Sequence, residues 1–204
     1  MLDKKSFRKE CLNRLKGLPK NRRYIYDKLV TKKVESVIAY HQPKSILLYL
    51  PMSIEVNLQN LMSVNRKKLK IFTPFIEGES FKMVQYRLPL KRNSFDIYEP
   101  PNSQKVYKRV DMIIVPVVGV DGDYRRVGFG KGMYDRFYEK LKIKPVTVFV
   151  QRVKCKTQKK VTDSYDIRAD YYITPKELII GKNNDNRDHF SRWRSRGRRC
   201  SSIF

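Results

Sequence analysis

Long apolar runs and histidines are both scarce in this 204-residue sequence. No stretch of about 18 apolar residues occurs in it, so we expect neither a membrane-spanning helix nor a membrane partner. The charged start, residues 1–8, is followed by no apolar segment, so we also expect no secretory signal. The two histidines, His41 and His189, supply too few ligands for a histidine-based metal site.

Cysteine is scarce as well, with only Cys11, Cys155 and Cys200 far apart in the chain. An odd number of cysteines at such spacings predicts neither a disulfide framework nor a zinc site. Because disulfides are rare where thiols are kept reduced, this cysteine usage indicates a cytoplasmic protein.

Acidic residues are few, since 20 of them stand against 45 lysines and arginines, which gives a net charge of +25. Such an excess attracts polyanions, and nucleic acid, anionic lipid, polyphosphate and polyglutamate ligands all stay open. The hydrophobic share of 41% and the charged share of 32% are typical of a soluble globular protein, and the length suits one domain.

The last 23 residues, 182–204, differ from the rest in composition. They hold seven lysines and arginines against two aspartates, with little hydrophobic periodicity and with a weak aromatic handle at Phe190 and Trp193. We predict a folded domain over residues 1–181 and a mobile basic tail over 182–204. The tail is expected to bind nucleic acid only non-specifically.

Helix-like and strand-like segments alternate along the domain. Amphipathic patterns predict helices over 3–16, 21–40 and 134–141, and Asn57 is expected to cap a further short helix. Apolar runs predict strands over 45–51, 69–74, 81–86, 110–118, 146–150 and 171–174, and the proline-rich stretch 98–102 predicts a surface loop. The alternation predicts a single three-layer α/β domain, with a mostly parallel central sheet flanked by helices.

The segment between the strongest strand and the last helix is rich in glycine and charge. It reads Asp121-Gly-Asp-Tyr-Arg-Arg-Val-Gly-Phe-Gly-Lys-Gly-Met-Tyr-Asp135. Ligands of open α/β sheets bind beyond the carboxyl ends of strands, where glycines let backbone N–H groups approach a phosphate. Neither the Walker motif nor the dinucleotide fingerprint is complete here, because Lys131 precedes a glycine and Met133 stands where glycine or alanine is needed. Glycine spacing alone is equally compatible with a flexible connecting loop.

The pattern Asp-x₄-Arg-x-Gly-x-Gly-x-Gly-x-Tyr-Asp, after a strand that ends in Val-Pro, resembles the signature of the 5-formyltetrahydrofolate cyclo-ligase family, also called 5,10-methenyltetrahydrofolate synthetases. Further landmarks resemble that family in the same order, and together they span about residues 4–180. They are 4–8, 49–56, 98–100, 149–151, 163–170 and 173–174. The sequence departs from the family at Tyr124, usually glycine, at Met133, usually aromatic, and at Tyr165, often histidine.

The resemblance implies ATP-dependent cyclisation of 5-formyltetrahydrofolate to 5,10-methenyltetrahydrofolate, with release of ADP and phosphate through a phosphorylated formyl intermediate. ATP would be the co-substrate and Mg²⁺ the metal. The folate substrate can carry polyglutamate, and a monomer is expected.

The resemblance also assigns roles to individual residues. Arg126 and Lys131 are the expected catalytic cations, Arg125 a solvated neighbour, and Asp135 and Asp166 the expected magnesium ligands. The expected ATP contacts are Lys4, Lys5, Arg8, Arg126, Gly128, Phe129, Gly130, Lys131, Gly132 and Tyr134. The expected folate contacts are Leu50, Met52, Glu55, Gly130, Lys131, Gly132, Met133 and Tyr134.

Each of these roles has an ordinary structural alternative. Lys4 and Arg8, one helical turn apart, also suit a solvated basic face. Asp135 also suits a first-turn helix carboxylate, Asp166 a turn residue, and Glu55 an exposed loop acid. For the whole protein, the alternatives are a basic RNA-binding protein and another nucleotide-dependent phosphotransferase.

Overall fold

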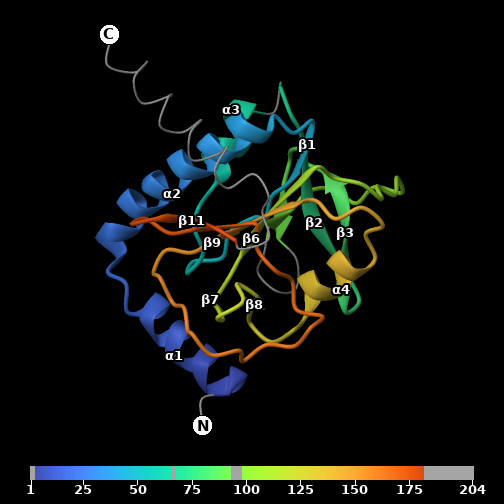
Figure 1. Cartoon of the computed structure of the whole chain (residues 1–204). Helices are drawn as coiled ribbons and strands as arrows, with labels where there is room; N and C mark the ends of the chain where they lie inside the picture. Colours follow the sequence, from blue (N-terminus) through green and yellow to red (C-terminus); the bar gives the residue numbers. More distant parts are fainter. Residues whose placement is uncertain (1–2, 66–67, 93–97, 182–204) are drawn as a thin grey trace.

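The computed structural model describes residues 3–65, 68–92 and 98–181, and its centre is a seven-stranded sheet (Figure 1). The strand order is β11-β10-β9-β6-β1-β2-β3. The bounds are β1 Ser45–Leu47, β2 Lys70–Glu77, β3 Ser80–Gln85, β6 Met112–Pro116, β9 Val146–Val150, β10 Tyr171–Ile173 and β11 Leu178–Ile180. The five inner strands run parallel, and the edge strands β3 and β11 are antiparallel to their neighbours. The predicted mostly parallel α/β sheet is therefore confirmed.

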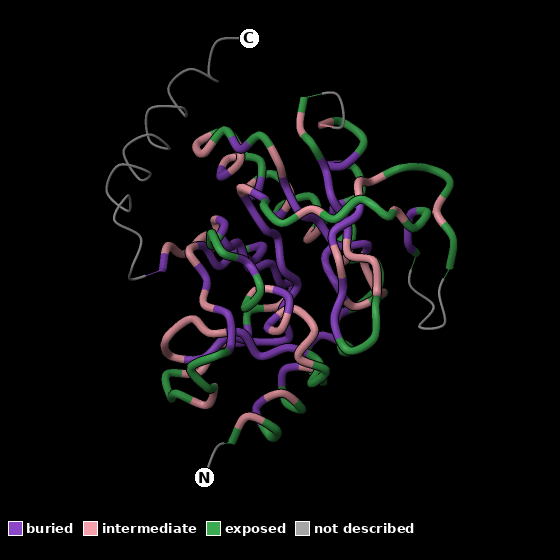
Figure 2. Tube along the Cα trace, turned by 90° about the vertical axis from the view of Figure 1, so that its right-hand side faces the viewer, coloured by how far each residue is buried: buried purple, intermediate pink, exposed green. Residues whose placement is uncertain are grey.

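Apolar side chains bury the sheet on both faces, and Figure 2 shows the buried segments gathered in the middle of the domain. Helix α2, Lys20–His41, packs Val30, Val34 and Val37 on one face, together with α3, Gln59–Asn65. Helix α4, Met133–Glu139, packs Phe137 on the other face, where its ring stacks on Phe81. Helices on both faces complete the predicted three-layer arrangement.

Helix boundaries follow from local capping groups. Helix α1, Lys4–Lys16, begins at a capping box in which the Asp3 carboxylate accepts from the Ser6 N–H at 2.7 Å. The predicted cap at Asn57 is present, because its side-chain oxygen accepts from the Gln59 N–H at 2.9 Å. Within the described ranges, no helix is both long enough and apolar enough to cross a membrane.

Three short pieces of sheet differ from the sequence expectation. Residues 98–102 were expected to form a surface loop, but Tyr98–Glu99 is strand β5, paired with β4, Lys91–Arg92, and Glu99 is buried. A hairpin of β7, Gly119–Val120, and β8, Arg126–Val127, begins just before the glycine-rich segment and extends into it. Edge strand β11 was not expected, because its three half-buried residues follow β10 too closely to show a period of their own.

The expectation that the cysteines stay unpaired is wrong. Cys11 in α1 and Cys155 in the loop after β9 form a disulfide, and both side chains are buried. The two residues are 144 positions apart, so no spacing pattern reveals the pair. The cysteine usage therefore no longer supports a reducing, cytoplasmic location. The predicted tail, 182–204, lies outside the described residues.

Candidate active site

The glycine-rich loop runs from the β7–β8 hairpin to α4, and its backbone is unusual at several positions. Gly130 has φ of +108°, which residues with a side chain rarely adopt. A Cβ at Gly128 would collide with the guanidinium of Arg126, so only glycine lets that side chain pass. Tyr124 has φ of 59°, in the left-handed region, at the position where the resembled family usually has glycine. The centroid of its ring lies 3.8 Å from the Lys156 ammonium, and this cation–π contact helps to stabilise the unusual backbone conformation.

A buried ion pair joins the end of the hairpin to α4. Arg126 Nε and Nη2 donate to the two carboxylate oxygens of Asp135 at 3.2 and 2.5 Å, and Asp135 also accepts from the Ile167 N–H. Both side chains are about nine-tenths buried. A buried pair of this kind needs such additional hydrogen bonds to offset the cost of removing both charges from water.

The start of α1 brings two more cations to the loop. Lys4 forms an ion pair with the buried Asp166 and with the exposed Asp163. Burial acts to lower the pKa of Lys4, but the bonds to Asp166 and Asp163 outweigh it and raise the pKa. Arg8 Nε donates to the Gly128 carbonyl at 2.8 Å, so α1 is fixed directly on the glycine loop.

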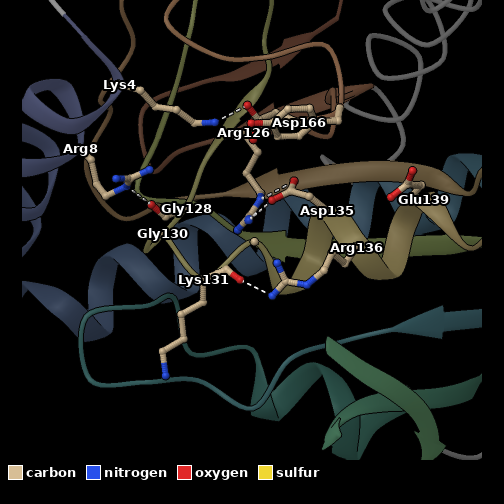
Figure 3. A pocket seen from close by; sticks show the side chains of 12 residues that line it. Lys4, Arg8, Arg126, Gly128, Gly130, Lys131, Asp135, Arg136, Glu139 and Asp166 are labelled. Atoms are coloured by element: carbon tan, nitrogen blue, oxygen red, sulfur yellow. Dashed lines mark hydrogen bonds and ion pairs between the residues drawn. The ribbon is translucent and has the colours of Figure 1, made fainter. Parts of the chain in front are cut away.

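These groups surround the cationic cavity, a hollow of about 290 Å³ (Figure 3). Its lining includes Lys4, Arg8, Arg126, Gly128, Gly130, Lys131, Gly132, Asp135, Arg136 and Asp166. In Figure 3 the Lys131 side chain extends away from the Arg126–Asp135 pair, while its carbonyl accepts from Arg136. The cavity thus gathers three segments that are distant in sequence around a cluster of positive charge.

A second hollow, the apolar cavity, has about 350 Å³ and lies on the other side of the loop. Its lining includes Tyr49, Leu50, Met52, Glu55, Ile76, Phe81, Glu99, Phe129, Met133 and Tyr134. Arg126, Lys131 and Gly132 line both cavities, so the two hollows meet at these residues.

Glu55 is a buried acid in the wall of the apolar cavity. Its Oε2 accepts from the Met52 N–H at 2.8 Å, and its side chain is 9% exposed. Burial raises the pKa of Glu55 to about 7, while the Met52 hydrogen bond and the charges of Arg152 and Arg126 act in the opposite direction. The carboxyl group therefore changes its charge near neutral pH.

The structure brings most of the predicted site residues together. Lys5 is exposed and belongs to neither lining, whereas Phe129 and Tyr134 line the apolar cavity and not the cationic one. Gly130 lines the cationic cavity, and the other predicted folate contacts line the apolar one. Arg125 is more than a solvated neighbour, because it donates to the carbonyls of Ser164 and Asp166 and so holds that turn.

Two functional candidates carry no prior assignment from the sequence. Arg136 donates to the carbonyls of Lys131 and Glu79, so it ties the glycine loop to the β2–β3 turn. Its position directly after the Tyr-Asp of the motif could have indicated that it lies at the site. Glu99 lies in the landmark 98–100 that resembles the family, but no role was assigned to it, because the surrounding prolines indicated a surface loop.

The two predicted metal ligands fit a hard divalent cation by their chemistry. Asp135 and Asp166 line the same cavity and offer carboxylate oxygens, which Mg²⁺ prefers. Both carboxylates face cations, Asp135 facing Arg126 and Asp166 facing Lys4. Among the described residues, no group of three or more His, Cys, Asp or Glu side chains forms a metal site, so the remaining ligands would have to come from phosphate and water.

Comparison with known proteins gives one consistent result. The model of the 5-formyltetrahydrofolate cyclo-ligase family matches residues 1–162. A 5-formyltetrahydrofolate cyclo-ligase of Mus musculus is 27% identical in an alignment of 184 residues that covers 82% of this chain and 91% of the relative. The NMR structure of Aquifex aeolicus 5,10-methenyltetrahydrofolate synthetase has a TM-score of 0.76 at 28% identity and covers 89% of this chain and 94% of its own. The structure of a Mycoplasma pneumoniae 5,10-methenyltetrahydrofolate synthetase, at 21% identity, TM-score 0.65 and coverages of 85% and 99%, supports the fold alone.

Proposed function

The chain belongs to the 5-formyltetrahydrofolate cyclo-ligase family, and from this premise we propose that its two cavities carry out ATP-dependent closure of 5-formyltetrahydrofolate. The products are 5,10-methenyltetrahydrofolate, ADP and phosphate. The observation that carries the proposal is the common wall of Arg126, Lys131 and Gly132 between a cationic and an apolar cavity. A phosphoryl group held on one side of that wall lies next to a ring held on the other.

The formyl oxygen is a poor leaving group, so it must first be phosphorylated by ATP. The reaction therefore needs the folate and ATP to be held in line with each other. That oxygen attacks the γ-phosphorus of ATP, the bond to the bridging oxygen breaks, and ADP leaves. N10 of the folate then attacks the activated formyl carbon, and the carbon–oxygen bond breaks to release phosphate. The protein contributes alignment and charge neutralisation, which are the main terms in phosphoryl transfer.

The cationic cavity is assigned to the triphosphate. Lys4 and Arg8 project from one side of α1 toward the glycine loop, where they can bind phosphate oxygens. Arg126 is fixed by Asp135, so its remaining donors point in a constant direction without reorganisation during the reaction. Lys131 is exposed at the edge of both cavities, where a flexible ammonium can follow the moving phosphoryl group.

The apolar cavity is assigned to the reduced pteridine ring. Leu50, Met52 and Met133 supply apolar walls, and Tyr134 supplies an aromatic face. The Glu55 carboxylate is within the same wall and can accept two N–H donors from the edge of the ring. Exclusion of water by these walls strengthens each of those hydrogen bonds.

Asp135 and Asp166 are the residues that would hold Mg²⁺. A bound magnesium ion supplies charge neutralisation for the phosphate oxygens. In the protein, Arg126 and Lys4 keep these two carboxylates in place and compensate their charge.

The test of the proposal is direct detection of the product. Purified protein is mixed with 5-formyltetrahydrofolate and Mg-ATP, and the near-ultraviolet absorbance of the methenyl group is followed. We expect the band to appear only when both substrates are present, with one ADP formed per folate converted. Folded protein that gives no band and forms no ADP would refute the proposal.

A further inference from the structure

Glu99 is a second buried acid in the apolar cavity, and none of the assignments above uses it. It lies in strand β5, its side chain is 7% exposed, and it lines the cavity together with Glu55. Its Oε1 accepts from the Ile76 N–H at 2.8 Å, which anchors the carboxyl group to strand β2. Within the described ranges, Oε2 has no hydrogen-bond partner and the carboxylate has no ion-pair partner.

A structural role alone explains this arrangement poorly. A carboxylate taken out of water without a cation is costly, and one hydrogen bond from a backbone N–H compensates only part of that cost. A glutamine would accept the same bond from Ile76 without burying a charge. The other ionisable groups in the lining are Tyr49, Glu55, Tyr98, Arg126, Lys131 and Tyr134. Arg126 already spends two of its donors on Asp135.

The ligand that suits two such acids is rich in N–H donors. Glu55 and Glu99 each use one oxygen on a backbone N–H and present the other to a cavity whose remaining wall is largely apolar. A flat heterocycle with amino and ring N–H groups would fill the apolar space and satisfy both free oxygens at once. A reduced pteridine has an exocyclic amino group and ring N–H groups, which are more donors than Glu55 alone can accept.

We propose that Glu99 determines substrate specificity by accepting a hydrogen bond from an N–H donor of the pteridine ring that Glu55 does not use. The assignment rests on the proposed function, since it takes the reduced folate as the occupant of the apolar cavity. Glu99 anchors the ring from the β5 side, and Glu55 anchors it from the turn after β1. A ring without the second donor would leave Oε2 buried and unpaired, and is therefore rejected.

The test separates the charge of Glu99 from its structural bond. Glu99→Gln keeps an acceptor for the Ile76 N–H but removes the charge and half of the acceptor capacity. Glu99→Ala removes both. Glu77→Gln is the matched control, because Glu77 follows Ile76 in β2, is exposed and pairs with Lys82 outside the cavity. For each variant, the KM for 5-formyltetrahydrofolate, the KM for ATP, kcat and the thermal midpoint are measured.

We expect Glu99→Gln to raise the folate KM by about tenfold to a hundredfold, the usual effect of losing a hydrogen bond to a charged group. The ATP KM and the thermal midpoint should stay near the wild-type values, and Glu77→Gln should match the wild type throughout. An active wild type beside a Glu99→Gln variant with unchanged folate KM would overturn the assignment alone, as would equal rises in both KM values. An inactive wild type would overturn the proposed function together with it.

Discussion

In the cationic cavity the acids Asp135 and Asp166 each face a cation, whereas in the apolar cavity the hydrogen bonds to Glu55 and Glu99 from the described part of the chain come from backbone N–H groups alone. The first arrangement holds opposite charges ready in pairs, so a charged ligand can exchange with one partner while the site stays neutral. The second leaves unused acceptor capacity in an apolar wall, so the ligand itself must supply the missing donors. Under the proposed function, we therefore expect phosphate to replace one partner of an ion pair in the cationic cavity. In the apolar cavity, we expect the ring to donate hydrogen bonds to the carboxylate oxygens.

At the common wall of Arg126, Lys131 and Gly132, a single substitution should affect both cavities. Lys131→Ala removes a cation that lines both cavities, and we expect turnover to fall by about 10²–10³-fold, because charge in the transition state loses a stabilising group. Lys131 is exposed, so the thermal midpoint should barely change. Steady-state assays of this variant beside Lys142→Ala, an exposed lysine outside both linings, check the prediction. Equal turnover in the two variants would remove Lys131 from the site.

Loss of the disulfide should affect the two cavities differently. The bond anchors α1, and α1 contributes Lys4 and Arg8 to the cationic cavity only. Replacing both Cys11 and Cys155 by alanine should lower the free energy of unfolding by about 5 kcal/mol, the scale for so long a closed loop. The ATP KM should rise and the folate KM should stay constant. Chemical denaturation and kinetics with and without reductant provide the measurement. Reductant should weaken the wild type and leave the double variant unchanged, and a wild type insensitive to reductant would contradict the prediction.

Glu55 should make stability and binding respond to pH in opposite directions. Because the pKa of Glu55 is raised from 4.5 to about 7 in the folded state, the native protein keeps a proton that the unfolded chain loses between those values. The free energy of unfolding should therefore fall as pH rises from 4.5 to 7, by about 2–3 kcal/mol. Folate affinity should increase over the same range, since only the carboxylate accepts two donors.

Glu55→Gln tests both halves of this prediction. Urea denaturation at pH 5 and pH 8 should show the variant more stable than the wild type at the higher pH only. Its folate KM should be raised and nearly independent of pH. A wild-type stability that does not fall between pH 5 and pH 8 relative to the variant would show that Glu55 titrates normally.

The smallest expected effect comes from substitution of Asp166, which forms an ion pair with Lys4 in the cationic cavity. Asp166→Asn should raise the Mg²⁺ concentration for half-maximal nucleotide binding by about tenfold, because one charged ligand is lost. The folate KM should not respond. The matched control is Asp163→Asn, since Asp163 also pairs with Lys4 but does not line the cavity. Magnesium titrations of nucleotide binding, followed without folate, would count against Asp166 if the two variants coincide.

Much of the fold could be predicted because its signals are local. The apolar run at 110–118 contains β6, and the cap at Asn57 and the pattern of Phe7, Cys11 and Leu15 in α1 could be read over a few residues. The glycine pattern likewise indicated the loop that joins the two cavities. Strand β5 escaped prediction because Tyr98 and Glu99 pair with β4 beside a proline-rich segment whose composition favours a loop.

The unpredicted parts of the site depend on contacts between distant segments. Arg126 and Asp135 form an ion pair, although the sequence motif had assigned Arg126 to the phosphate and Asp135 to the metal. The Cys11–Cys155 bond and the Lys4–Asp166 pair each span more than 140 positions, so only the folded chain brings them together. Glu99 depends on burial by β2, which residue type alone does not reveal.

The disulfide also has a topological consequence, because residues 11–155 form a closed covalent ring. The ring contains the glycine loop and all of the residues that line the apolar cavity, while Lys4, Arg8 and Asp166 lie outside it, on the segments before Cys11 and after Cys155. A protease that cleaves once inside the ring would open the circle without producing two molecules. The nicked chain would migrate as a single species until a reducing agent released its halves.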